Sequence, residues 1–135
     1  MADRYICSAT RIRVRGPRQL FGFLRASAVA TIVARRTPGN ARTRLLGMPP
    51  FLVFHTLTVW ESEAAMLDFV SSPQHRVAMA GFEEWTERGR FVRFSSETRR
   101  VGWRRAFRAL RDPDGSYQRG AGYTRRGVSE APSEA

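Results

Sequence analysis

The stretch Phe51-Leu-Val-Phe-His-Thr-Leu-Thr-Val-Trp60 decides the fold of this chain. In a β-strand, successive side chains point to opposite faces of the sheet. One face of this strand therefore carries Phe51, Val53, Leu57 and Val59, and the other carries Leu52, Phe54, Thr56, Thr58 and Trp60. Both faces hold large apolar groups, which indicates a strand in the middle of a sheet with something covering each side.

Working outward from this strand, the periodicity of apolar residues predicts the remaining elements. A strand is expected over residues 5–14, a second over 41–48 and a last one over 91–95. A helix is predicted over 17–36, and its apolar stripe is expected to consist of Leu20, Phe21, Leu24, Ala28 and Ile32. Ser62 and Ser72 are placed to cap helices over 63–71 and 73–87. The second of these should bury His75, Ala78, Met79, Phe82 and Trp85.

The order of elements, β-α-β-β-α-β, predicts an α+β, ferredoxin-like fold with an antiparallel four-stranded sheet and both helices on one face. We expect the open face to carry Phe54 and Trp60, which is a liability for a monomer. Pairing of two such sheets would hide these groups, so the sequence predicts a homodimer that forms a dimeric α/β barrel. The expected organisation is a domain over residues 1–98, a basic helical extension over 99–111 and a disordered tail over 112–135.

Composition limits the classes of function. A chain of 135 residues with 42% hydrophobic and 26% charged residues is typical of one soluble globular domain. It has neither an apolar run long enough to span a membrane nor a signal-peptide pattern, so we expect a cytoplasmic protein. The single cysteine, Cys7, excludes an internal disulfide framework. The net charge of +11 comes entirely from arginine, a pattern that codon bias also produces, and charge alone does not lead us to expect nucleic acid as a partner.

Several segments resemble the dimeric α/β barrel superfamily, which includes antibiotic-biosynthesis monooxygenases and haem-degrading monooxygenases. The segment from Leu57 to Met66, with Trp60-Glu-Ser62, carries this resemblance. The opening strand from Thr10 to Arg15, the helix end from Arg35 to Gly39 and the phrase from His75 to Met79 are similar to the spheroidene-monooxygenase-like group within it. The resemblance covers residues 5–96 and implies the barrel fold more strongly than any one reaction.

Matching the haem-degrading branch residue by residue argues against that chemistry. Phe69 stands where that branch has a tryptophan, and Met79 stands where it has the haem-ligating histidine. Methionine is a poor substitute for an oxygen-activating proximal ligand. His75 instead matches the histidine of the spheroidene-monooxygenase-like group, whose members are thought to use haem. The resemblance therefore implies His75 as a general base or, if haem is bound, as its axial ligand.

The candidate site is a cavity between sheet and helices, with His75 as the catalytic residue. Its predicted substrate-binding lining is Phe54, Thr56, Thr58, Trp60, Phe69, Met79 and Trp85. The alternative for His75 is a half-buried side chain bonded to the backbone or to Ser72. His55, on the face with Val53 and Leu57, is interpreted as a packing residue. Arg11 and Arg13 are interpreted as solvated or dimer-edge residues, or as ligands of an acidic substrate.

No Rossmann glycine pattern, P-loop or zinc-protease motif is present, so no flavin or nicotinamide cofactor and no metal site are expected. Haem and cofactor-free chemistry both stay open. Three functions remain in competition at this point. The first is a monooxygenase-like oxidoreductase that acts on a hydrophobic small molecule. The second is a non-catalytic dimeric ligand-binding or stress-response module, and the third is a basic nucleic-acid-binding protein.

Overall fold

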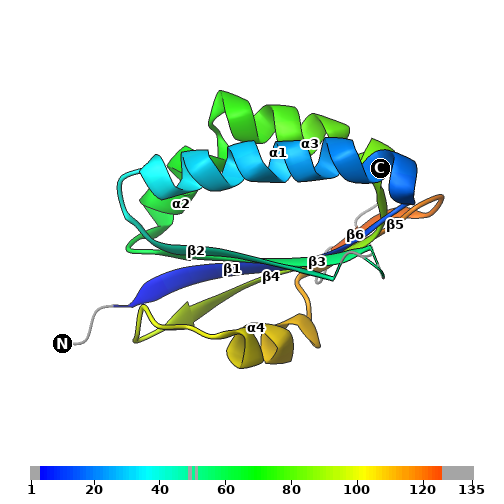
Figure 1. Cartoon of the computed structure of the whole chain (residues 1–135). Coiled ribbons are helices and arrows are strands. Elements are labelled where there is room, and N and C mark those ends of the chain that lie inside the picture. The colour runs from blue at the N-terminus through cyan, green and yellow to red at the C-terminus, as the bar shows by residue number, and fades with distance from the viewer. Residues whose placement is uncertain (1–3, 49, 51, 126–135) are drawn as a thin grey trace, which may run out of the picture.

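The computed structural model describes residues 4–48, 50 and 52–125. Its elements follow the predicted order and then continue (Figure 1). Their bounds are β1 Tyr5–Val14, α1 Pro17–Arg36, β2 Asn40–Met48, β3 Val53–Trp60, α2 Glu63–Val70, α3 Pro73–Trp85, β4 Thr86–Ser96, α4 Trp103–Leu110, β5 Gly115–Gln118 and β6 Gly122–Arg125. The strands form one antiparallel, open sheet in the order β2-β3-β1-β4-β5-β6. The ferredoxin-like arrangement over β1 to β4 is confirmed.

Helices α1, α2 and α3 cover one face of this sheet, and α4 lies against the other (Figure 1). Two apolar clusters lie between the sheet and α1 to α3. One surrounds Phe23, Phe54 and Phe82, and the other surrounds Trp60, Met66 and Phe69. Ser62 and Ser72 cap α2 and α3 as predicted, since their hydroxyl oxygens accept from the backbone N–H groups of Ala65 and His75.

The premise that Phe54 and Trp60 lie on an open face is wrong. Their side chains are 2% and 0% exposed and pack beneath the chain's own helices. The opposite face carries Cys7, Leu57 and Val59, and α4 covers these groups with Ala106 and Leu110. The basic helical extension thus closes part of the face for which the sequence predicted a second copy.

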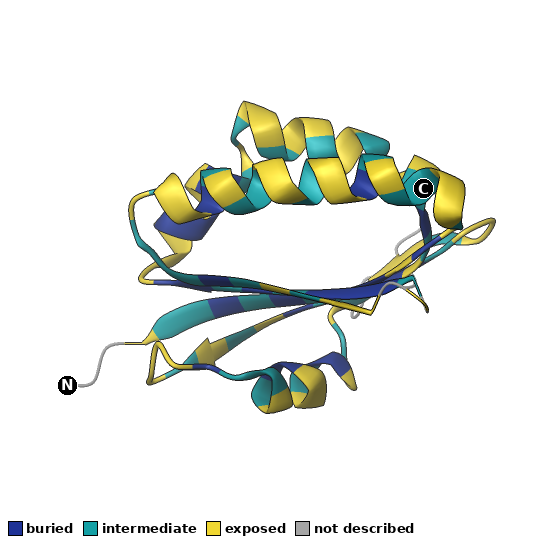
Figure 2. Cartoon of the chain, in the orientation of Figure 1, coloured by how far each residue is buried: buried dark blue, intermediate teal, exposed yellow. Residues whose placement is uncertain are grey.

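The predicted apolar stripe of α1 is also wrong. Phe21 is 76% exposed, and Leu24, Ala28 and Ile32 are exposed with it, whereas Phe23 and Ala34 are buried. The outer face of this helix is exposed along its length (Figure 2). The helix carries apolar residues around most of its circumference, so spacing alone did not identify the face that contacts the sheet.

The sheet has six strands rather than the expected four. Part of the predicted disordered tail, residues 115–125, forms the hairpin β5–β6 and extends the sheet beyond β4. Tyr117 and Tyr123 are directly opposite each other in this hairpin, with ring centroids 4.9 Å apart. Gly120 and Gly122 have φ values of 90° and 86°, a backbone region that favours glycine, and they make the connection. Residues 126–135 of the predicted tail lie outside the described residues.

None of the helices in the described ranges has the length and apolar character needed to cross a bilayer.

Candidate active site

A patch of hydroxyl groups lies at the centre of the sheet, on the face covered by α1 to α3. Ser8 and Thr10 of β1 are directly opposite Thr58 and Thr56 of β3. All four are half-buried, and the hydroxyls of Thr10 and Thr56 share a hydrogen bond. Apolar side chains would be expected beneath packed helices, so this hydroxyl patch (Ser8, Thr10, Thr56 and Thr58) is a polar floor suited to a ligand with hydroxyl or carbonyl oxygens.

Aromatic rings adjoin the hydroxyl patch at one end. Trp60 follows Thr58 on the same face of β3, and its ring stacks on Phe69 of α2 with centroids 5.4 Å apart. The Phe69 ring in turn meets His75 of α3 edge-on, with centroids 4.7 Å apart. This aromatic stack (Trp60, Phe69 and His75) connects the sheet to the first turn of α3 and confirms that three of the predicted site residues lie together.

The chain's backbone fixes the orientation of the His75 ring. Its Nδ1 lies 3.1 Å from the carbonyl oxygen of Val70, and its own backbone N–H donates to the Ser72 hydroxyl. A carbonyl oxygen can only accept, so Nδ1 carries a proton and the neutral ring keeps a free lone pair on Nε2. Burial lowers the pKa of His75 below its usual 6.5, although the Val70 hydrogen bond partly raises it. His75 is therefore neutral near pH 7 and able to accept a proton.

Trp60 adds an unpartnered donor to the same region. Its side chain is 0% exposed, and its Nε1–H has no hydrogen-bond partner among the described residues. An unsatisfied buried donor costs free energy, on the order of 1–3 kcal/mol. A ligand oxygen accepting from this group would remove that cost.

The remaining predicted site residues do not join this set. Phe54 lies at the other end of the hydroxyl patch, where its ring packs against Phe23 with centroids 4.9 Å apart. Met79 is 46% exposed, so a lining role for it has no support in the structure. Trp85 packs against two glycines of α1 and α3, Gly22 and Gly81, where a Cβ atom would approach its ring to 2.8 and 2.5 Å. Trp85 is thus a packing residue between helices.

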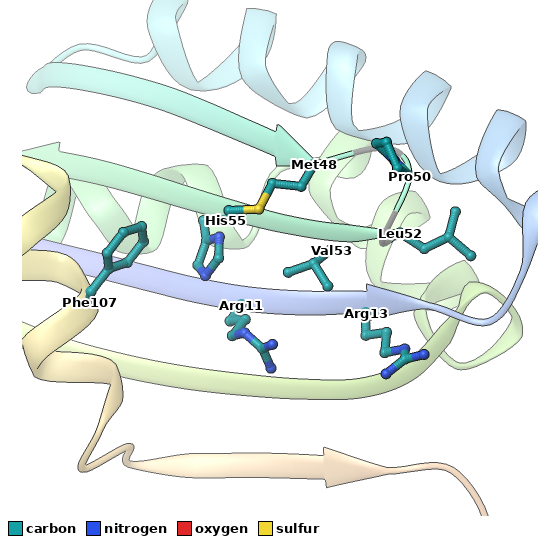
Figure 3. Close-up of a pocket in the computed structure, with 8 residues that line it drawn as sticks. All are labelled: Arg11, Arg13, Met48, Pro50, Leu52, Val53, His55 and Phe107. Carbon is teal, nitrogen blue, oxygen red and sulfur yellow. The ribbon is translucent and has the colours of Figure 1, made fainter.

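The opposite face of the sheet holds a second group of residues, of which sequence reasoning recognised only single members. A hollow there is lined by Arg11, Arg13, Met48, Pro50, Leu52, Val53, His55 and Phe107 (Figure 3). Register places Arg11 directly opposite His55. The alternation of β1 and β3 could have shown that these two share a face, but Phe107 comes from α4, whose position the sequence did not predict. Within the described residues, no group of three or more metal-ligating side chains is present.

Comparison with known proteins places the chain among oxygenase-like folds. The sequence profile of the family described as "Antibiotic biosynthesis monooxygenase" matches residues 10–81, more than half of the chain. The match ends before α4, β5 and β6. A comparison with curated proteins finds no match.

Solved structures share the fold at low sequence identity. A variant of SnoaB, described as a cofactor-independent oxygenase from Streptomyces nogalater, has a TM-score of 0.60 at 18% identity, covering 72% of this chain and 96% of that one. A proposed antibiotic biosynthesis monooxygenase from Nitrosomonas europaea has a TM-score of 0.61 at 14% identity, covering 71% and 92%. A protein from Shewanella oneidensis has a TM-score of 0.63 at 12% identity, covering 70% and 92%.

Proposed function

Because the chain belongs to the antibiotic biosynthesis monooxygenase family, we propose that it is a monooxygenase-type oxidoreductase that acts on a hydrophobic small molecule. The substrate lies between the sheet and helices α1 to α3, over the hydroxyl patch and beside the aromatic stack. The observation that carries this proposal is the environment of His75. Its ring is neutral, its Nδ1–H is held by the Val70 carbonyl, and its Nε2 is free to take a proton.

The proposed reaction begins with proton removal. Nε2 of His75 accepts a proton from a phenolic hydroxyl of the substrate, which leaves an electron-rich anion that reacts with oxygen. Hydroxyls of Thr56 and Thr58 and the Trp60 Nε1–H orient substrate oxygens. The similarity to SnoaB, whose description calls it cofactor-independent, supports a route without a bound cofactor.

The reaction balances without an external reductant when the substrate supplies all the electrons. A naphthol with a free para carbon loses its phenolic hydrogen and its para hydrogen and gains one oxygen atom, giving a naphthoquinone. The second oxygen atom leaves as water with those two hydrogens. The substrate is oxidised, and both atoms of molecular oxygen are reduced.

Haem remains the alternative cofactor. His75 could ligate haem through Nε2, because a carbonyl bond to the other ring nitrogen is the orientation that ligating histidines commonly show. Bound haem would supply oxygen activation. Absorption spectra of the purified protein with and without added haemin separate the two routes, since only a ligated haem gives a shifted Soret band. The resemblance to the spheroidene-monooxygenase-like group likewise stays a prediction.

Oxygen consumption tests the proposed function. The protein is given a panel of naphthols and hydroquinones in an oxygen electrode, and His75→Asn is compared with Arg76→Ala, an exposed neighbour on the same helix. We expect His75→Asn to lose ~100-fold or more of the rate, the usual contribution of a general base, and Arg76→Ala to keep it. Binding of these phenols without any oxygen consumption would instead identify a non-catalytic ligand-binding module.

The homodimer stays a prediction. Size-exclusion chromatography with light scattering tests it directly, with twice the mass of one chain as the expected result. A single-chain mass at all concentrations measured would contradict it.

A further inference from the structure

The hollow on the α4 face of the sheet has a volume of about 650 Å³. It is separated from the proposed active site by the sheet itself, since Val53 and His55 point away from the face that carries Phe54 and Thr56. Figure 3 shows Arg11, Arg13, Val53 and His55 on this face, with Phe107 of α4 at its side. Nothing in the proposed oxygenase reaction uses these residues.

Four arginines share this face. Arg11 and Arg13 of β1 are directly opposite Arg90 and Arg88 of β4 in the sheet register. None of the four makes an ion pair or a side-chain hydrogen bond with another described residue. Like charges directly opposite each other destabilise a sheet. This arginine belt (Arg11, Arg13, Arg88 and Arg90) therefore favours a bound anion, and Arg11 and Arg13 are the members that line the hollow.

His55 supplies an independent indication of a ligand. Its side chain is 6% exposed, and its Nδ1 has no hydrogen-bond partner among the described residues. The rings of Phe107 and Trp103 fix its position from α4, with centroid distances of 4.8 and 6.4 Å. Burial, and then the nearby Arg11 charge, lower the pKa of His55 below 6.5, so the empty site holds a neutral ring. A neutral ring can donate one hydrogen bond to an anion beside Arg11.

The rest of the hollow is apolar. Met48, Leu52, Val53 and Phe107 line it. Leu52 has a φ of 57°, which is rare for a residue other than glycine, and Val14 N–H donates to its carbonyl oxygen at 2.8 Å. Strained backbone of this kind is often retained at ligand sites. The arrangement provides an apolar wall next to a pair of free guanidinium groups.

We propose that this hollow binds an amphipathic organic anion, with its charged head on Arg11, Arg13 and His55 and its apolar body against Met48, Leu52, Val53 and Phe107. Guanidinium groups match the geometry of a carboxylate or phosphate head. Nucleic acid is the competing occupant for arginines on a sheet. The hollow favours the small anion, because its wall is apolar and its buried polar group, His55, is reached only from inside.

Octanoate is the probe, and octanamide is its uncharged control. Binding is followed by calorimetry and by the NMR signals of the His55 ring in the full-length protein. We expect octanoate to bind and to shift the His55 signals while leaving those of His75 unchanged. Octanamide should bind at least ~10-fold more weakly, because it lacks a charge-assisted bond to arginine. Equal binding of both probes, or octanoate binding that leaves His55 unshifted, would overturn the proposal.

Variants locate the charged head. Arg11→Gln should weaken octanoate binding at least ~10-fold, and Arg11→Lys should recover part of it because the charge returns without the planar fork. Arg25→Gln removes the same charge from the exposed surface of α1 and should change nothing. Circular dichroism confirms that each variant is folded. The proposal fails if Arg25→Gln weakens binding as much as Arg11→Gln, or if a single-stranded oligonucleotide displaces octanoate with steep salt dependence.

Discussion

The edge of the His75 ring meets Phe69 at a centroid distance of 4.7 Å, so the residue proposed as the base is held by an aromatic neighbour as well as by its hydrogen bond to Val70. Phe69 is 8% exposed and stacks on Trp60 on its other side. The same ring therefore shields His75 from water and connects it to the central strand. Burial is the main cause of the lowered His75 pKa, and Phe69 contributes to that burial.

Removing this ring should loosen the site. We predict that Phe69→Ala lowers the free energy of unfolding by about 3 kcal/mol, as expected for a buried phenylalanine, and moves the His75 pKa up toward 6.5 as water enters. Chemical denaturation and NMR titration of the His75 ring give the two quantities. An unchanged His75 pKa in a folded variant would show that Phe69 does not shield it.

A matched pair on α1 tests which face of that helix is buried. Phe21 is 76% exposed and Phe23 is 4% exposed. We predict that Phe23→Ala costs roughly 3–5 kcal/mol of unfolding free energy, whereas Phe21→Ala costs less than about 0.5 kcal/mol. Equal losses measured by urea denaturation would mean that α1 is rotated relative to the arrangement described above.

The cover provided by α4 can be tested through Cys7. This thiol is 0% exposed, and burial raises its pKa to about 11, so both access and ionisation oppose its alkylation. We predict that Ala106→Asp, which places a charge at a fully buried position of α4, exposes Cys7 to iodoacetamide. Arg104→Ala, at an exposed position of the same helix, should leave it protected. Rapid labelling of Cys7 in the unaltered protein would contradict the packing of α4.

Stability should depend on pH through both histidines. Each has a folded-state pKa lowered below 6.5, His55 mainly by burial and then by Arg11, and His75 mainly by burial. The unfolded chain therefore binds more protons as the pH falls through 6.5, and the folded protein loses stability below that pH. We predict a lower unfolding free energy at about pH 5 than at about pH 7, with a smaller difference in His75→Gln. An identical pH difference in both proteins would exclude His75 as a source.

The sequence predicted the core of the fold but not the use of each sheet face. Alternation along β3 correctly separated Phe54 and Trp60 from Leu57 and Val59. Both sets are apolar, so the pattern could not decide which set lies beneath α1 to α3. The position of α4 depends on long-range packing of Ala106 and Leu110, and local spacing carries little information about such contacts.

Composition was also a poor guide to the last ordered segment. Residues 115–125 are rich in glycine and polar groups, which is typical of disorder, yet paired tyrosines and two glycines with positive φ form a hairpin. In the candidate site, the helix spacing that predicted His75 and Phe69 was sufficient because short caps fix their positions. It was insufficient for Met79, one turn further along α3, which faces outward.

The central claim is that His75 promotes insertion of an oxygen atom into a bound phenol, and isotopically labelled oxygen gas tests it most directly. The protein is mixed with a naphthol under labelled oxygen, and the product is analysed by mass spectrometry. The account predicts one labelled atom in the naphthoquinone formed by the unaltered protein, and almost no labelled product with His75→Asn. Unlabelled product, or equal labelling by His75→Asn, would contradict it.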